Sequence, residues 1–544
     1  MRQTLPAAGQ PDDPSAWAPL AHPIFRALWI AAVVSNVGTW MQDVGAGWLM
    51  TSLSASPLMV ALVQAATSFP VMLLALPAGA LADIVDRRRM LLVTQSWMLL
   101  AAAALGGLTL LGMMSAPLLL GLTLALGIGS AFTMPAWSAM IPELVGRKEL
   151  HAAITLNGLA MNVSRAIGPA LAGYIMALTS PGAVFLLNAA SFLGIIAVLF
   201  YWKSPAKTSE LPAERLLGAM RNGLRFVRHS GPVKAVMIRA GSFFFFASAN
   251  WALLPVLVRH ELHGGPGDYG MVLGAIGLGA VGSVFILPWL RQRISTDVLK
   301  KAGATLYAAS LALMAVVPTL PWLLAIALLA GMAWLGVMAS IQGVAQMALP
   351  AWVRARGLSM VMVVVMAGMA GGAMLWGQIA TYCSVPQALQ LAAAGLALSV
   401  LATWRIRLIQ MEGIDLTPSL HWGTPVVDQE PDLDRGPVLV TLAYQVNPAR
   451  LSEFLRLMER QRVARQRDGA FYWQLFQDAA ASDRYLETFL AESWLEHLRH
   501  HERVTQADRL LQDKIGQCLV GESPAVVTHY LAVTEARDQE ASEN

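Results

Sequence analysis

The sequence predicts an all-α membrane protein with twelve transmembrane helices in two six-helix bundles, followed by a C-terminal cytoplasmic α+β domain. Apolar residues make up 56% of the 544 residues and charged residues only 13%, against roughly 25% in soluble domains. Twelve apolar runs are long enough to cross a bilayer, which takes about 20 residues. Residues 1–406 carry a net charge of +12 and residues 407–544 one of −8, as expected for a membrane body joined to a soluble tail.

The expected spans are separated by short turns, several of which contain Pro or Ser. The spans are 27–50, 57–81, 90–112, 117–141, 152–178, 182–202, 235–258, 268–290, 298–318, 321–349, 355–383 and 386–406. Of the 24 Lys and Arg residues before residue 407, 22 fall at one side, whereas Arg259 lies in an opposite loop and Arg165 within a span. Cytoplasmic loops carry the excess of basic residues, so we expect both termini in the cytoplasm.

These patterns divide the chain into seven segments. They are a cytoplasmic N-terminal tail (1–26), an N-terminal six-helix bundle (27–202), a cytoplasmic amphipathic linker (203–234), a C-terminal six-helix bundle (235–406), a linker (407–436), a ferredoxin-like cytoplasmic domain (437–534) and a disordered tail (535–544). The amphipathic linker has an apolar stripe and a basic stripe, formed by Leu216, Leu217, Met220, Leu224 and Val227 and by Arg221, Arg225 and Arg228. A helix lying on lipid headgroups and a solvated linker helix both fit this pattern.

Two motifs in the first half indicate a family. Gly79-Ala-Leu-Ala-Asp83 followed by Arg87 and Arg88 resembles the loop signature of the major facilitator superfamily, although Ile84 and Asp86 depart from it. The resemblance implies a cytoplasmic latch, in which Gly79 allows close helix approach and Asp83 accepts from a helix N-terminus or pairs with a base. A plain cluster of positive charge is the alternative.

The second motif is Gly168-Pro169 with Gly173 in the fifth span, which resembles the gating helix of the superfamily's exporters. Pro removes a backbone hydrogen bond and Gly permits bending and close packing. Further stretches, among them Ser35-Asn36-Val-Gly38-Thr39-Trp40 and Met134-Pro135-Ala136-Trp137, are similar to the branch of bacterial transmembrane secretion effectors that contains the enterobactin exporter. This resemblance implies a bacterial inner-membrane exporter of a small amphipathic molecule, such as a siderophore, drug or secondary metabolite, working by alternating access and driven by proton antiport.

Ionisable residues inside a bilayer are costly and by default indicate function. Asn36, Trp40 and Asp43 share one face of the first span, and Asn162 precedes Arg165 by one turn in the fifth. A carboxylate that alternates between an Arg partner and a proton would serve as a coupling device. A static buried ion pair and an unpaired Asp43 that reaches outside water remain open.

The second half offers amides and aromatic rings within its spans rather than acidic residues. Asn250, Gln342 and Gln346 are candidate cavity residues, with helix packing as an equal alternative. The aromatic candidates for a substrate wall are Trp251, Trp334, Trp376 and Phe243–Phe246.

The tail from residue 437 reads as βαββαβ. Residues 438–446 alternate as a strand, a helix follows Asn447-Pro448, strands are expected at 470–477, 484–491 and 525–533, and helices begin after Ser493 and Thr505. The helix after Pro448 should bury Leu451, Phe454, Leu455 and Met458. The order resembles the small ferredoxin-like domains related to antibiotic-biosynthesis monooxygenases, which implies pairing into a homodimer.

His497, His500 and His501 lie on one helical stretch of this tail, and i, i+4 histidines can bind metal. Because no carboxylate-His signature accompanies them, we expect no metal and no cofactor, and a tail that serves dimerisation or regulation. The expected partners are a small-molecule substrate, protons and membrane lipids. The acidic tail argues against nucleic acid. A membrane-tethered monooxygenase and a ligand sensor that moves nothing remain the alternatives to a transporter.

Overall fold

The computed structural model describes residues 15–202, 224–404 and 415–533, with short gaps at 16, 147, 318, 351, 420, 424–426, 428–430 and 522–524. The chain forms two compact units. Unit 1 contains residues 1–211, 237–342 and 359–407, and unit 2 contains residues 212–236, 343–358 and 408–544. Each unit is described by itself.

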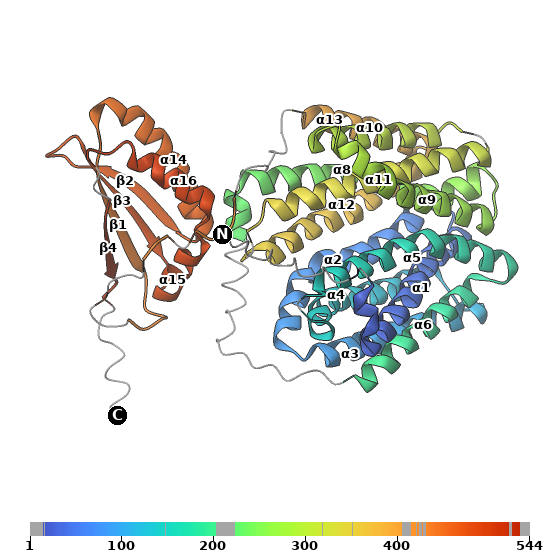
Figure 1. Cartoon of the computed structure of the whole chain (residues 1–544). Coiled ribbons are helices and arrows are strands. Elements are labelled where there is room, and N and C mark those ends of the chain that lie inside the picture. Colours follow the sequence, from blue (N-terminus) through green and yellow to red (C-terminus); the bar gives the residue numbers. More distant parts are fainter. Residues whose placement is uncertain are drawn as a thin grey trace, which may run out of the picture. The chain divides into compact units, whose positions relative to one another are not determined.

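The N-terminal half of unit 1 is made of long helices (Figure 1). They are α1 (Pro23–Leu53), α2 (Pro57–Ile84), α3 (Arg87–Leu110), α4 (Ala116–Leu144), α5 (Leu150–Leu178) and α6 (Pro181–Tyr201). Proline occupies the first turn of α1, α2, α4 and α6, where its missing N–H costs no hydrogen bond. Helix α1 packs against both α5 and α6, so it lies inside this half.

The C-terminal half follows the same plan. Its helices are α8 (Gly231–Val256), α9 (Pro266–Arg291), α10 (Thr296–Met314), α11 (Leu320–Met347), α12 (Arg354–Tyr382) and α13 (Val385–Ala402). A π-helical turn, η2 (Leu257–Glu261), continues α8. Helix α10 packs against α13, and α9 packs along α5 of the other half. This α5–α9 contact joins the two halves within unit 1.

Among the described residues, ten helices are long and apolar enough to cross a membrane. The expected spans 152–178 and 298–318 form α5 and α10, which are helical but not among these ten. Both are more polar, because α5 contains Arg165 and α10 begins with Asp297, Lys300 and Lys301. The twelve-span arrangement therefore stays a prediction.

The tail contains a four-stranded antiparallel sheet in the order β2-β3-β1-β4. The strands are β1 (Val438–Gln445), β2 (Tyr472–Gln477), β3 (Arg484–Ala491) and β4 (Val526–Leu531), and the helices are α14 (Leu451–Asp468), α15 (Trp494–Arg503) and α16 (Gln506–Gly516). The predicted order of strands and helices is confirmed, including the two helices that begin after Ser493 and Thr505 between β3 and β4. Asn447, Ser493 and Thr505 accept the hydrogen bonds expected of helix caps.

The helices cover one face of this sheet. On β1 the side chains of Val438, Val440, Leu442 and Tyr444 are buried, as the alternation predicts. On α14 Phe454 is buried, but Leu455 is 45% exposed, so its predicted place in the core is wrong. The apolar stripe on that helix is narrower because it faces a single sheet.

A buried polar network, which no local sequence pattern predicts, lies among these core residues. The Glu487 carboxylate is fully buried on β3 and accepts hydrogen bonds from Tyr444 Oη at 2.6 Å, Arg465 Nε at 3.1 Å and Trp473 Nε1 at 2.8 Å. Burial and the neighbouring carboxylate hold the pKa of the Tyr444 hydroxyl well above its usual value. A buried carboxylate is tolerated when its lone pairs are satisfied in this way.

Two predicted linkers are partly described. Residues 203–223, which include Leu216, Leu217, Met220 and Arg221, lie outside the described residues. Within unit 2, Arg225 donates to Glu492 at 2.8 Å and to the Gly469 carbonyl at 2.5 Å, so this side chain contacts protein rather than headgroups. In the linker 407–436, Ser419 pairs with Val504 and Trp422 Nε1 donates to Gln512 at 3.0 Å.

Candidate transport site

A cavity of about 140 Å³ lies within unit 1, and both halves line it. Trp40, Asp43, Gln64, Thr67 and Arg165 come from α1, α2 and α5 of the N-terminal half, whereas Trp251, Tyr269, Trp334 and Met369 come from α8, α9, α11 and α12. The cavity therefore brings together five of the candidates from the sequence, namely Trp40, Asp43, Arg165, Trp251 and Trp334. The wall combines a carboxylate, a guanidinium and several aromatic rings.

Close packing of α1 on α5 positions the charged residues. A Cβ added to Gly168 would lie 2.6 Å from the Cβ of Trp40 and 3.1 Å from the Val37 carbonyl oxygen, so only glycine allows this approach. The guanidinium of Arg165, one turn before Gly168, lies 5.3 Å from the centre of the Trp40 ring. A cation at this distance from an indole face is attracted by the ring.

Asp43 and Arg165 line the same cavity without an ion pair between them in the described part of the chain. The Asp43 side chain is exposed to the open space of the cavity. Arg165 is half-buried, and its Nε has no hydrogen-bond partner among the described residues. The static buried pair is thus not the arrangement present. The two side chains instead lie on one cavity wall as separate groups.

The two halves meet closely at one end of this cavity. The Arg259 guanidinium in η2 donates to Thr51 Oγ1 at 3.0 Å and lies 5.3 Å from the Trp48 ring centre. Trp48 in turn stacks on Tyr269, with ring centres 5.8 Å apart. Arg259, which charge counting had placed alone in an outer loop, therefore helps to close the end formed by the C-terminus of α1 and the N-terminus of α9.

The glycine motif of α5 contributes to the same closure. A Cβ on Gly173 would lie 2.7 Å from the Cα of Gly270 on α9, and one on Gly270 would lie 2.9 Å from the Pro169 carbonyl oxygen. The motif residues thus place α5 and α9 in direct backbone contact. Such contact between small residues is typical of helix packing in membranes.

The predicted latch has a different geometry from the one expected. A Cβ on Gly79 would meet no atom of the described part of the chain within 4 Å, so the expected close approach at Gly79 is absent from this conformation. The side chain of Asp83 lies outside the described residues, although its backbone belongs to the last turn of α2.

The basic residues of that motif do make cross-helix contacts. Arg87 donates to the Ala139 carbonyl at 2.7 Å and pairs with Glu143 on α4, and Arg88 donates to the Leu199 and Phe200 carbonyls of α6, each at 2.7 Å. Asp86, which departs from the family pattern, caps α3 by accepting from the Arg89 N–H at 2.8 Å. A cluster of positive charge without partners would not make these bonds.

The other amide candidates lie away from the described cavity lining. Asn250 is buried and donates to Tyr307 Oη at 3.2 Å, and Asn162 donates to the Gly158 carbonyl at 2.9 Å within its own helix. Gln342 and Gln346 are exposed on α11, and Asn36 is half-buried on α1. The role of these five as substrate residues stays a prediction.

The aromatic candidates divide in the same way. Trp251 and Trp334 line the cavity, with ring centres 5.4 Å apart. Phe243 and Phe244 are buried and pack around Trp334, and Trp376 donates to the Phe245 carbonyl at 2.9 Å. Gln64, Thr67, Tyr269 and Met369 were missed, because only the crossing of α2, α9 and α12 brings them to the cavity.

Two helical halves around an internal cavity define a multi-pass membrane transporter. A profile of the transmembrane secretion effector family matches residues 14–539. The chain therefore belongs to that family, within the major facilitator superfamily.

Curated relatives are transporters as well. The chain is 26% identical over 256 residues to the staphyloferrin A transporter of Staphylococcus aureus, a match covering 46% of this chain and 64% of that protein. It is 26% identical to a multidrug efflux pump of Mycolicibacterium fortuitum, covering 55% of this chain and 75% of the pump. It is 24% identical to the enterobactin exporter of Salmonella typhimurium, covering 59% of this chain and 76% of the exporter.

Solved structures share the fold. A bacterial homologue of the lysosomal transporter Spinster superposes with a TM-score of 0.52 at 15% identity, covering 71% of this chain and 94% of that one. A POT family transporter gives 0.59 at 12% identity, covering 70% and 95%. These relatives and neighbours are membrane transporters and not enzymes, so the monooxygenase alternative has no support among them.

Proposed function

We propose that this protein exports a small amphipathic molecule across the bacterial inner membrane by alternating access, with proton antiport as the driving reaction. One observation carries the proposal: Asp43 is exposed to a cavity that both halves line, and it forms no ion pair with Arg165 among the described residues. A carboxylate in that position can take up and release a proton while the substrate site changes sides.

The charges on the wall support a coupling role. An ionised carboxylate inside a membrane protein needs a compensating charge, and the Arg165 guanidinium lies on the adjacent helix, held over the Trp40 ring. Protonation of Asp43 would leave the cavity with a net positive charge, and deprotonation would restore neutrality. Antiport requires that the proton and the substrate exclude each other, so a cationic group of the substrate would bind while Asp43 is deprotonated and leave when Asp43 takes up a proton.

The relatives narrow the substrate class. Two of them are named for siderophores and one for drugs, and the indole rings of Trp40, Trp251 and Trp334 offer apolar faces to ring-bearing molecules. The substrate class is tested in everted membrane vesicles on which a pH gradient is imposed. The uptake of each compound is measured for a panel of staphyloferrin A, enterobactin and cationic dyes. Accumulation of one compound that collapses with a protonophore supports the proposal, and no gradient-dependent flux of any would contradict it.

The proposed orientation places both termini in the cytoplasm and counts α5 and α10 as spans. A reporter fused after Trp404 is expected to show a cytoplasmic location. Loops rich in Lys and Arg are cytoplasmic, and in the twelve-span map this position falls on the same side of the membrane as those loops. A reporter inserted near Gly265, between η2 and α9, is expected to show the outside. Both reporters on one side would contradict the twelve-span map.

The tail is proposed to be a ferredoxin-like dimerisation module. The strand order β2-β3-β1-β4 and the crossing helices support that fold. The face opposite the helices is open and apolar at Tyr472, Phe476, Leu486, Val526 and Tyr530, each at least 39% exposed. Exposed apolar sheet faces of this kind mark interaction surfaces.

A tail fragment is therefore expected to be a dimer. The fragment should begin at residue 415, because Ser419 and Trp422 bond to Val504 and Gln512 of the folded tail. Light scattering on residues 415–534 is expected to give twice the monomer mass. Thr441 lies in the middle of the open face. Thr441→Lys should give monomers, because each protomer would bury one ammonium group in the interface between the two open faces and the two like charges would repel each other. Ser452→Lys on the exposed side of α14 is the control, and a monomeric wild-type fragment would contradict the proposal.

A further inference from the structure

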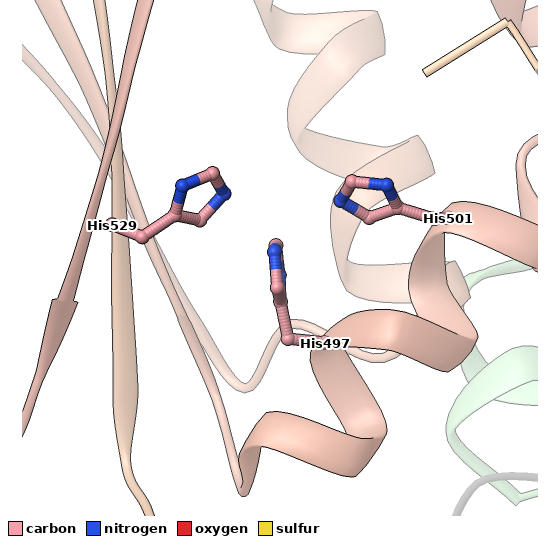
Figure 2. Close-up of side chains that lie close together, drawn as sticks. All are labelled: His497, His501 and His529. Atoms are coloured by element: carbon pink, nitrogen blue, oxygen red, sulfur yellow. The ribbon is translucent and has the colours of Figure 1, made fainter. Parts of the chain in front are cut away.

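Three histidines of the tail meet on the helix-covered side of the sheet (Figure 2). His497 and His501 are one turn apart on α15, and His529 lies on β4 opposite Val440 of β1. Their rings point toward one another, and one nitrogen from each lies within 4.8 Å of the others. The helical spacing in the sequence predicts that His497 and His501 are neighbours, whereas His529 joins them only through the pairing of β4 with β1.

His497 is the buried member of this group, which we call the histidine triad. It is 1% exposed, and neither of its ring nitrogens has a hydrogen-bond partner among the described residues. Buried polar groups in native proteins almost always have a partner. A partner for the His497 ring would therefore have to lie in the space between the three imidazole rings.

The electronic state of the triad suits metal binding. Burial lowers the pKa of His497 to about 3 and that of His501 to about 4, and it also lowers the pKa of His529. All three imidazoles are thus neutral near pH 7, and each keeps a lone pair for a ligand. The nearby Arg465 cation is already paired with Glu487 at 3.1 Å, which reduces its repulsion of a second cation.

We propose that His497, His501 and His529 bind one divalent transition-metal ion of the Zn²⁺ class. Imidazole nitrogens at about 2.1 Å from a tetrahedral ion lie about 3.4 Å apart, so the rings need to close by about an ångström from their present spacing. His501 and His529 are only half-buried, which leaves their rings room to turn. Water fills the fourth position.

The ion would fasten the edge of the sheet. Strand β4 is an edge strand, held on one side by β1 alone, and the triad links it to α15. A bound ion would therefore stabilise the tail by cross-linking two elements that are 28 residues apart in the chain at His501 and His529.

Metal titration of the full chain tests the proposal. The protein is purified in detergent with an affinity tag that contains no histidine, treated with EDTA and titrated with Zn²⁺ by calorimetry and with Co²⁺ by visible absorption. One ion per chain is expected, with the Co²⁺ absorption of a tetrahedral nitrogen site. His501→Gln and His529→Gln should each weaken binding at least about tenfold, since loss of an outer-shell partner alone costs 10- to 100-fold.

His421→Gln is the matched control. Its ring is already bonded to Ser419 Oγ at 2.6 Å and to Gln512 Oε1 at 3.0 Å, so its replacement should leave the metal affinity unchanged. In the wild-type chain, Zn²⁺ should also raise the thermal transition of the tail above that in EDTA, a readout that needs no variant. Absence of stoichiometric binding, or binding that persists in both triad variants, would show that the three rings are an aromatic packing cluster and would overturn the proposal.

Discussion

Asp43→Asn is expected to reduce efflux driven by a pH gradient at least about tenfold, a loss of about 1.4 kcal/mol or more of coupling. Asparagine keeps the shape of the side chain but cannot carry a proton, so the cavity can no longer exchange a proton for the substrate. Exchange of labelled for unlabelled substrate across the same vesicles should persist, because it needs the movement of the halves but no net proton transfer. The two rates are measured in everted vesicles with equal amounts of inserted protein.

Two further variants distinguish the effect of losing a titratable group from the effect of changing the shape of the side chain. Asp43→Glu retains a titratable carboxylate in the cavity and should keep part of the gradient-driven flux. Arg165→Ala removes the charge that lies over the Trp40 ring and should impair transport of substrates with an anionic group most. Full gradient-driven efflux in Asp43→Asn would remove Asp43 as the coupling site, whatever the effect at Arg165.

Gly173→Ala is expected to shift the conformational equilibrium strongly. The added Cβ would lie 2.7 Å from the Cα of Gly270 and 2.9 Å from the Pro266 carbonyl oxygen, both backbone atoms that cannot rotate away. Overpacking costs about 1–3 kcal/mol, which corresponds to a shift of about 5- to 150-fold away from the state in which α5 and α9 touch. Efflux should fall because that state is one of the two that alternating access requires.

Gly158→Ala on the same helix provides the control. A Cβ there meets no atom within 4 Å, and both substitutions gain the same helix propensity of about 1 kcal/mol, so any difference arises from the contact with α9. The second readout is the Val44→Cys variant, because Val44 lines the cavity. An impermeant thiol reagent is added on the side of the membrane where the α1–α2 turn lies. Val44→Cys should react with it faster when combined with Gly173→Ala than when Gly173 is retained. Equal behaviour of the two alanine variants would contradict a gating role for this contact.

Local patterns predicted the elements well and the site only in part. The helix start at Pro57 and the caps at Ser493 and Thr505 are where the sequence places them, because capping and proline geometry depend on a few neighbouring residues. Predictions that needed a partner helix were less reliable. Gly79 has no close neighbour among the described residues, because the position of a residue on one helix does not determine which other element packs against it.

The sequence by itself determined that this chain is a membrane protein with a C-terminal tail of mixed polar and apolar composition. Hydropathy and net charge are sums over residues and do not depend on the tertiary structure. It also singled out Asp43 and Arg165, because a charge within an apolar run is costly wherever the run packs. Only the tertiary structure decided that these two share a cavity with Trp251 and Tyr269, and that His529 meets His497 and His501. The reason is that long-range neighbours are set by helix crossing and strand pairing, which join residues that no local period connects.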